Sequence, residues 1–566
     1  MESLKLFAKY APNITFIAVL LGAFSGLLYS ALIPIVMVSL ADDTTFPTAS
    51  SITKVWGIEV ANSNFASLFF GLCLVILIFR STSEIMLRWL SLDIRHNLRT
   101  ELYDRAQKAG IISLEYVGPS RLIQALANDV ATVVIGAGIF PQILTSVVTT
   151  FGVLAVLAYL EFGIFVFVVK VIVFGIIVYQ IPIMVATRYF AIAREHEDYL
   201  QEGFRGLISG AKELKLNEAK KSTYNDEVLQ KEELTLKQLE RKGSAINVWS
   251  GNFSGLLSFV AIGGVGFIFI NYHDISTVEV FAAIMILLYL SGPVIMIMNF
   301  IPQLAITKIS LRKIEQLYNE LPNEGVSEEV RPVKPWQSMI LKDVHFNYPQ
   351  QKNHSKLFAI GPIDITINRG EITYITGGNG SGKSTLAKLI TLHYQVSQGD
   401  VMFDDVKVDK SLLTDYRQQV ACIYSDYYLF DRVLGTGDLS EDYKQRIDHY
   451  LKAFGIDNKV EFENGKFSTL KLSDGQRRRL ALIVTIIEDK PLILFDEWAA
   501  DQDPEFKDVF YREILPALKK QNKAIVVISH DDRYFDLADK MIVMESGKVV
   551  DPSQRNIPQY NNIEVI

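Results

Sequence analysis

The sequence contains little cysteine and no excess of basic charge, and each shortage excludes a class of protein. Only 2 of the 566 residues are cysteine, so no disulfide framework is expected. Cys73 in an apolar run and Cys422 in a predicted strand are expected to fill apolar space. Acidic residues outnumber basic ones by 63 to 56, for a net charge of -7. With no large basic face, nucleic acid is not an expected partner.

Charge is unevenly distributed along the chain. Up to about Tyr318 charged residues are sparse apart from two polar blocks, whereas the sequence from Pro332 onward is typical of a soluble α/β protein. The length suggests two or three domains. A stretch rich in proline, glycine and glutamate between Leu321 and Pro335 ends the last long helix. We therefore expect a membrane domain over 1–320, a linker over 321–335 and a second domain over 336–566.

Long apolar runs dominate the first domain. A helix needs about 20 mostly apolar residues to cross the ~30 Å hydrocarbon layer. The first run is longer than the apolar core of a signal peptide, so it is expected to be a true span. Six stretches are long and apolar enough: Ile14–Leu40, Phe65–Leu87, Ala131–Tyr159, Phe162–Val185, Gly255–Ile270 with its flanks, and Val278–Met298.

The connecting segments predict the orientation. Arg88–Arg121 and Arg188–Lys242 are basic, Asp42–Asn64 is acidic, and the connections near Glu161 and His273-Asp274 are short. The positive-inside rule places both basic segments and the N-terminus in the cytoplasm. Six crossings then return the second domain to the cytoplasm. Each basic block is expected to form two helices that continue out of the membrane and are joined by a short turn.

The second domain contains a complete phosphate-binding loop. An alternating strand, Glu371–Thr376, precedes it and a helix beginning at Ser384 follows, which is the context that this motif requires. Its backbone N–H groups and the helix N-terminus form an anion site. Lys383 is expected to reach the β- and γ-phosphates of ATP, and Ser384 to ligate Mg²⁺. The predicted loop residues are Gly377, Gly378, Asn379, Gly380, Ser381, Gly382, Lys383, Ser384 and Thr385.

Two further buried strands end in residues suited to phosphate chemistry. Pro491–Glu497 is an apolar run that ends in two carboxylates. Asp496 is expected to orient the magnesium shell, and Glu497 to accept a proton from the attacking water. His530 ends the strand that begins at Lys523, where ligands gather in open α/β sheets, and is expected to contact the γ-phosphate. The alternative, a surface acidic pair, loses weight beside an upstream phosphate loop.

Together with the sequence Leu-Ser-Asp-Gly-Gln at 472–476, these motifs resemble those of the ATP-binding cassette (ABC) exporters. The resemblance covers essentially the whole chain. It implies a polytopic α-helical membrane domain with six transmembrane helices, fused to an α/β P-loop NTPase cassette. One motor and six spans imply a homodimer with two composite ATP sites. Coupling would run from the motor to helices near Ile111–Tyr116 and Phe204–Lys215.

The resemblance also implies roles for individual residues. Tyr348 matches the aromatic residue that stacks on adenine, and Asp503 matches the loop that links the two sites. Ser473 and Gly475, at the start of the helix over Gln476–Ile487, would bind the γ-phosphate of ATP held by the opposite subunit.

Two positions depart from the family pattern. Ser425 stands where the family has a glutamine that helps to hold Mg²⁺, so direct metal contact is in doubt and water or Asp426 could substitute. Asp474 replaces the middle glycine of the signature, and its side chain is expected to point away from phosphate. These departures, with Trp498–Pro504 after Glu497, resemble a narrower bacterial group. It contains the cyclic-peptide exporters of syringomycin and pyoverdine-precursor type and an efflux protein for lasso-type microcins.

The leading hypothesis is a homodimeric exporter in a bacterial cytoplasmic (inner) membrane, moving a small amphipathic, cyclic-peptide-like or siderophore-related molecule and touching membrane lipid. A lipid or multidrug exporter is an alternative, and an ATP-gated channel or regulatory subunit is another. The six spans exclude a soluble ABC protein.

Charged residues within the spans are candidates for the substrate path. Lys170 lies roughly 10 Å inside a span, where it could face a central cavity or extend to the outer headgroups. Arg80 and Glu84, four residues apart, are expected to form a helix salt bridge.

Overall fold

The protein is described by a computed structural model that covers residues 12–41, 52–55, 58–61, 63–271, 277–327, 329–349, 358–435 and 441–551. The chain divides into two compact units. The first comprises Met1–Tyr103 and Ser120–Leu317, and the second comprises Asp104–Pro119 and Tyr318–Ile566. Most of the acidic segment expected to face outward, and the connection at His273-Asp274, lie outside the described residues.

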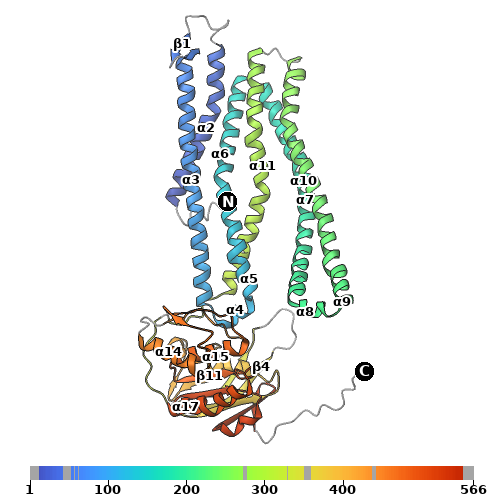
Figure 1. The fold of residues 1–566 in the computed structure, drawn as a ribbon. Coiled ribbons are helices and arrows are strands. Elements are labelled where there is room, and N and C mark those ends of the chain that lie inside the picture. Colours follow the sequence, from blue (N-terminus) through green and yellow to red (C-terminus); the bar gives the residue numbers. More distant parts are fainter. Residues whose placement is uncertain are drawn as a thin grey trace. The chain divides into compact units, whose positions relative to one another are not determined.

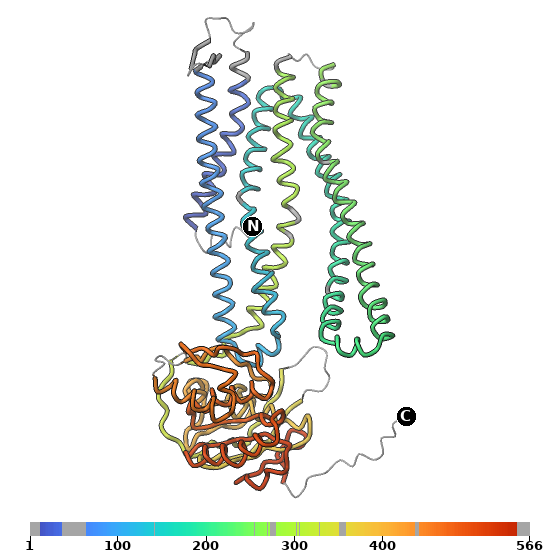
Figure 2. Tube along the Cα trace, in the orientation of Figure 1, coloured from blue at the N-terminus to red at the C-terminus, as the bar shows by residue number. Residues whose placement is uncertain are grey.

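The first unit is built from long helices (Figures 1 and 2). Six helices are long and apolar enough to cross a membrane, which confirms the predicted fold class for this half. They are α2 (Pro12–Ala41), α3 (Ser63–Lys108), α6 (Val130–Leu160), α7 (Phe162–Ser209), α10 (Lys231–Gly263) and α11 (Thr277–Glu320). A short hairpin of β1 (Ile52–Val55) and β2 (Ile58–Ala61) precedes α3.

Several of these helices are longer than a membrane crossing requires. The 48 residues of α7 span about 72 Å at 1.5 Å per residue, roughly twice the hydrocarbon thickness. α7 and α10 run side by side and are joined by short helices (Figure 1). These are α8 (Ala211–Lys215), α9 (Glu218–Thr223) and the π-helix η2 (Tyr224–Gln230). The expected pair of long helices is present, joined by helical turns where a short turn was expected.

Small residues let helices of this unit approach closely. A Cβ atom at Gly26 of α2 would lie 2.9 Å from Thr149 Oγ1 of α6, closer than real contacts allow. The hydroxyl of Ser83 on α3 donates to the carbonyl of Ala18 on α2 at 2.6 Å. Because lipid tails are as apolar as leucine, helices in a membrane associate through this kind of close packing and interhelical hydrogen bonding.

The second unit contains two sheets. The six-stranded sheet has the order β14-β13-β5-β12-β11-β8, and the four-stranded sheet has the order β4-β3-β6-β7. The strands of the first are β5 (Ile372–Gly377), β8 (Val420–Ile423), β11 (Leu492–Asp496), β12 (Ala524–Ile528), β13 (Lys540–Glu545) and β14 (Lys548–Val550). Those of the second are β3 (Ser338–Asn347), β4 (Ala359–Asn368), β6 (Gln398–Phe403) and β7 (Val406–Lys407).

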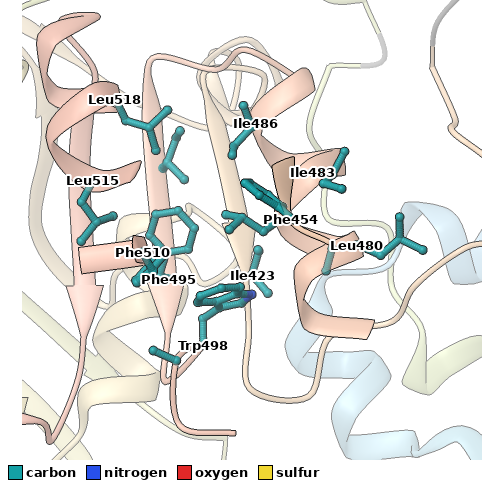
Figure 3. Close-up of a cluster of buried hydrophobic side chains, with 14 of the residues drawn as sticks. Ile423, Phe454, Leu480, Ile483, Ile486, Phe495, Trp498, Phe510, Leu515 and Leu518 are labelled. Carbon is teal, nitrogen blue, oxygen red and sulfur yellow. The ribbon is translucent and has the colours of Figure 1, made fainter. Parts of the chain in front are cut away.

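The central strands are buried from end to end. All residues of β5, β11 and β12 are buried, and these strands pair in parallel. Parallel strands covered on both faces read as continuous apolar runs, which is why three strands could be predicted from sequence. Phe495 of β11 packs with Trp498 and Phe510 against the helix α15 (Asp474–Ile487), as Figure 3 shows.

One boundary differs from the expected division of the chain. The segment Asp104–Pro119, which includes α4 (Ile111–Val117), clusters with the cassette rather than with the helices on either side of it. The β-bridge between Ala109 and Asn323 joins this segment to the chain that leaves α11. The division into 1–320, 321–335 and 336–566 stays a prediction. It divides the chain by sequence order, whereas the two compact units are defined by contacts.

Candidate nucleotide-binding site

The predicted phosphate loop lies between β5 and α12 (Lys383–Ile390), at the carboxyl edge of the parallel sheet. Gly377 has φ 151°, and a Cβ atom there would lie 2.2 Å from the carbonyl oxygen of Met544. Only glycine therefore fits where the loop leaves the strand. Gly378, Asn379 and Gly380 are exposed. The loop thus presents its backbone at the end of a fully buried strand.

Lys383 lies over this loop. Its Nζ atom donates to the carbonyl oxygens of Gly377 and Gly378, both at 3.0 Å. Burial lowers the pKa of the ammonium group, while the nearby carboxylates of Glu497 and Asp496 act in the opposite direction. The lysine is therefore close to both acidic residues of the predicted site, with an ammonium group that a phosphate can attract away from the carbonyls.

Asp496 is a buried carboxylate at the end of β11. Burial, and then the charge of Glu497, raise its pKa above the ordinary value. The backbone of Ser425 donates a hydrogen bond to this carboxylate, while Ser425 itself is exposed. The residue at the glutamine position of the family thus reaches the predicted metal ligand through its backbone.

Oxygen ligands in this region suit magnesium. Mg²⁺ is usually bound by one or two protein oxygens together with substrate phosphates. The exposed Ser384 follows Lys383 in the first turn of α12, and the buried carboxylate of Asp496 lies near the same lysine. Among the described residues no group of three or more metal-ligating side chains occurs. The donor set therefore fits an ion held jointly with a nucleotide.

Glu497 and His530, which were each expected to act at the γ-phosphate, lie beside each other. Their side chains meet at 3.2 Å between Glu497 Oε1 and His530 Nε2, and both are a little less than half exposed. Glu497 has φ 50°, a left-handed conformation that is uncommon outside glycine. Its N–H donates to the carbonyl of Ile528 at 3.0 Å, which ties β11 to the strand that precedes His530. Strained backbone of this kind concentrates at functional sites.

Tyr348 lies beside the helix that follows the phosphate loop. Its hydroxyl is 2.9 Å from Thr385 Oγ1 of α12, and its ring meets those of Phe346 and Tyr394 edge-on at 5.1 and 5.9 Å. The predicted adenine platform is therefore held in place by the phosphate loop helix and by two aromatic neighbours.

The signature residues occupy the N-terminus of α15. Ser473 caps this helix and forms a reciprocal capping box with Gln476. Asp474 is exposed on its first turn, 3.9 Å from Arg477. Among the described residues no hydrogen bond or ion pair joins Ser473 or Gly475 to the phosphate loop. Ser473, at the helix end that was predicted to bind a γ-phosphate, is therefore exposed and makes no contact of this kind with the described residues of its own phosphate loop.

The segment after Glu497 is fastened to α15 by residues that the sequence analysis missed. Arg478 donates to the carbonyl oxygens of Glu497 and Trp498 at 2.9 and 3.0 Å, and pairs with Asp501 at 2.6 Å. The indole of Trp498 donates back to the carbonyl of Arg478 at 3.0 Å. Three consecutive arginines, Arg477–Arg479, were the available signal.

The next positions of the same segment have partners on the same helix. Gln502 donates to the carbonyl of Gly475 at 3.0 Å, and Asp503 is paired with Arg479. The sequence Trp498–Asp503, which departs from the common family pattern, is thus explained by its contacts with α15. Asp503 also caps the helix α16 (Pro504–Val509) by accepting from Phe506 N at 2.9 Å.

The short helix α4, which contains the segment Ile111–Tyr116 named above for coupling, is attached to the nucleotide site by contacts that the sequence analysis did not predict. Glu115 accepts hydrogen bonds from Lys388 Nζ at 2.7 Å and from Tyr394 at 2.5 Å. Tyr394 stacks on Phe346 at 4.7 Å and touches Tyr348. Because Glu115 and Tyr394 are far apart in sequence, no local pattern could have shown this contact.

Lys170 lies on α7 with its side chain exposed, as either of its two predicted roles requires. The expected salt bridge on α3 is confirmed, with Arg80 Nε 3.0 Å from Glu84 Oε1.

A membrane unit with six candidate spans and a cassette with this loop, signature and carboxylate pair define an ATP-driven transporter. The chain belongs to the ABC transporter family, and the family pattern matches residues 360–500. It is 32% identical to the ATP-binding protein SyrD of Pseudomonas syringae pv. syringae over 555 residues, 95% of this chain and 94% of that protein. The predicted half-transporter of the SyrD type is thereby confirmed.

Other relatives share less of the chain. An ATP-dependent lipid A-core flippase of Methylobacillus flagellatus is 28% identical over 329 residues, 55% of this chain and 54% of that protein. One from Pectobacterium atrosepticum is 30% identical over 224 residues, 37% of each chain. The protein is therefore a multi-pass membrane transporter that binds ATP in a cytoplasmic domain and couples its hydrolysis to export.

Proposed function

We propose that two copies of this chain form an exporter that moves a peptide-like molecule, such as a cyclic peptide or siderophore precursor, out of the cytoplasm of a bacterium. The supporting observation is the Glu497–His530 pair beside a complete phosphate loop. A protein that binds nucleotide without hydrolysing it has no need of this pair. The proposal thus includes three statements: that the transporter is a homodimer, that its cargo is peptide-like, and that it lies in the inner membrane.

Each residue of the proposed ATP site has a specific task. Tyr348 stacks on adenine, and the loop from Gly377 to Thr385 cradles the phosphates. Lys383 binds the β- and γ-phosphates, and Ser384 and Asp496 hold Mg²⁺, which offsets charge on the transferred phosphoryl group. Glu497 takes a proton from the attacking water, and His530 holds the γ-phosphate. Ser425, with Asp426 beside it, positions Asp496 in place of the family's glutamine.

The second half of each site comes from the other copy. Ser473 and Gly475 would contact the γ-phosphate of ATP bound to the partner, with Gln476 completing the helix N-terminus. Asp503 would link the two sites. The exposure of Ser473 and its lack of a bond to its own phosphate loop favour this arrangement. Asp474 is exposed and beside Arg477, so its charge is partly offset.

The cargo is argued from the extent of the similarity. The match to SyrD runs along both halves of the chain, whereas the flippase matches cover 55% of it or less. The membrane half, where cargo must bind, is therefore better represented by the SyrD comparison. Trp498–Pro504 and Ser425-Asp426 carry the resemblance to cyclic-peptide exporters. Lipid export is the second candidate, because ATP-dependent lipid A-core flippases are among the similar proteins.

Uptake into inside-out vesicles tests the proposal. Purified protein would be reconstituted and offered a set of cyclic peptides and siderophore precursors, with ATPase stimulation as the first screen. ATP-driven accumulation above the external concentration is expected for at least one of them. An ATP-gated channel could only equalise concentrations, so ATP-dependent entry without a gradient would refute the export proposal. In the same assay, Lys170→Ala should slow an acidic cargo; unchanged export would remove Lys170 from the path.

A further inference from the structure

The membrane unit carries an ion pair in the last third of an apolar span. Arg80 and Glu84 lie on α3, whose preceding stretch Phe65–Phe79 contains no charged residue. Arg80 follows the first residue of α3 by 17 positions, about 25 Å along the helix axis. The hydrocarbon layer is ~30 Å thick. Ionisable side chains within an apolar span are costly, and for that reason they generally mark functional positions.

Two tyrosines from other helices adjoin this pair. The rings of Tyr29 on α2 and Tyr289 on α11 stack at 6.1 Å with an angle of 25°. The Arg80 guanidinium lies 5.7 Å from the centre of the Tyr29 ring, with Nη1 3.5 Å from its hydroxyl. Each tyrosine is 12 residues from one end of its helix, about 18 Å. We call Arg80, Glu84, Tyr29 and Tyr289 the Arg80 cluster.

The ion pair is accessible and incompletely bonded. The Arg80 and Glu84 side chains are 42% and 39% exposed. Among the described residues, Arg80 Nη2 and Glu84 Oε2 make no hydrogen bond. Exposing these unbonded charged atoms to lipid would be unfavourable. A water-filled path through the membrane unit, or an occupant, is the environment that they suit.

We propose that the Arg80 cluster binds the polar head of the cargo, and that this head is zwitterionic and peptide-like. A carboxylate or carbonyl of the cargo would accept from Arg80 Nη2, and an ammonium or amide N–H would donate to Glu84 Oε2. Tyr29 and Tyr289 would flank the head with their rings. This inference rests on the proposed export function and names the chemistry of its cargo.

Net charge selects this class over a phosphorylated lipid head. The arginine and the glutamate cancel, so a zwitterion adds no uncompensated charge in a region of low dielectric. A phosphate head would bring negative charge with only one arginine to meet it and a carboxylate beside it. Leaving such a charge unpaired away from water costs more than one hydrogen bond returns.

Matched amphiphiles test the inference through direct binding. The probes are 2-aminododecanoyl-glycine, which is zwitterionic, its C-terminal amide, its N-acetyl form, and dodecyl phosphate. Binding of each radiolabelled probe to the full-length protein in lipid nanodiscs is measured without ATP. The zwitterion is expected to bind about tenfold more tightly than dodecyl phosphate.

Single substitutions should separate the two ends of the head. Arg80→Gln is expected to weaken the two probes with a carboxylate by about tenfold and to spare the amide. Glu84→Gln should weaken the probes with a free amine and spare the N-acetyl form. The matched control is Asp104→Asn with Lys108→Gln, a pair of the same spacing and distance on the same helix, at its far end. It should leave all four affinities unchanged.

Several results would overturn the inference. Equal loss of affinity for every probe would show that the ion pair only stabilises the helix. No binding of any probe would show that the cluster is not a binding site. Full recovery of all affinities in Arg80→Glu/Glu84→Arg would also overturn the inference, because that exchange keeps the ion pair within α3 but reverses the positions of its two charges. If a second copy covers the cluster, the single substitutions would change the dimer mass distribution and not probe selectivity. That result would also overturn it.

Failure of the site and failure of export are distinguishable. ATP-driven accumulation of the zwitterion that Arg80→Gln leaves unchanged would retain export and reject the Arg80 cluster. Charge-selective binding without accumulation would retain the cluster and reject export.

Discussion

At the scale of single residues, the backbone around Glu497 holds its carboxylate at the edge of the sheet. Its left-handed φ and its contact with His530 place the carboxylate where two parallel strands end. Arg478 of α15 donates a hydrogen bond to the backbone carbonyl oxygen of Glu497. The side chain therefore stays partly exposed while its backbone is fixed, as a residue that must meet water and phosphate requires.

Glu497→Gln tests the proposed base. We expect ATPase turnover to fall by about 10²- to 10⁴-fold, the usual contribution of a positioned base, because the amide cannot accept the proton. ATP binding should be retained, since the phosphate loop is untouched. The control is Glu505→Gln, an exposed glutamate on α16. Steady-state ATPase and nucleotide binding are the two measurements, and full turnover in Glu497→Gln would reject this role.

Arg478→Lys tests how the segment that carries Glu497 is held. A lysine keeps the charge but cannot reach two carbonyl oxygens and Asp501 with one planar group. Because charged hydrogen bonds contribute about 1.5–3 kcal/mol, we expect kcat to fall roughly tenfold or more.

Two comparisons separate positioning from general damage in Arg478→Lys. The KM for ATP should change little, since Arg478 has no proposed contact with nucleotide. Arg477→Lys, at the exposed neighbouring position, should behave as wild type. An equal change in both variants would contradict the assignment.

The sequence predicted residues at strand ends and missed those that hold them. Asp496, Glu497 and His530 stand where apolar runs end. Because a strand buried on both faces is apolar throughout, its end can be recognised in the sequence as the first polar residues after the run. Arg478 stands in a polar run on a helix, where a solvated charge and a carbonyl-binding charge look alike. Whether such an arginine is solvated or binds carbonyl oxygens depends on the segment that packs against the helix, here the turn after Glu497.

At the scale of elements, α4 links the polypeptide between two spans to the nucleotide site. Glu115 contacts Lys388 of the phosphate loop helix and Tyr394. Tyr394 in turn packs with Phe346 and Tyr348. A short helix of seven residues is too short to be stable alone, so it depends on these contacts. If adenine stacks on Tyr348 as proposed, its binding would thereby alter the support of α4.

Glu115→Ala tests this link. We expect basal ATPase within about twofold of wild type, because partly exposed ion pairs contribute little stability. Stimulation by cargo and ATP-driven uptake should fall by more than half. Tyr394→Phe should have a smaller effect in the same direction, because it keeps the ring contacts. Asp400→Ala removes another ion pair of the same unit, with Lys407, and should leave coupling intact. Equal loss of basal and stimulated rates in Glu115→Ala would refute the link.

The attachment of α4 also shows where prediction from sequence ended. Long apolar runs predicted all six spans, because length and hydropathy are local properties. The contacts of Glu115 join residues more than 270 positions apart. The resemblance implied a coupling role for Ile111–Tyr116, but Glu115 is a single charge among apolar neighbours there, and its partners are visible only in the folded chain.

At the scale of the whole molecule, the proposed ATP sites require two chains. Each chain holds a phosphate loop with its base, and separately a signature helix whose capping serine is exposed. If the sites are composite, defects in the base and in the signature should complement each other according to which chain carries them. Differently tagged chains, purified as mixed dimers, allow both arrangements to be made.

Mixed dimers of Glu497→Gln with Ser473→Arg should retain ATPase activity. One composite site then carries both defects and the other carries none, whereas each parent homodimer has two defective sites. The reverse arrangement, both substitutions on one chain paired with wild type, should be inactive, because each site then contains one defect. Sites built within single chains would give the opposite pattern. Equal activity in the two mixed dimers would contradict the composite site and with it the proposed dimer.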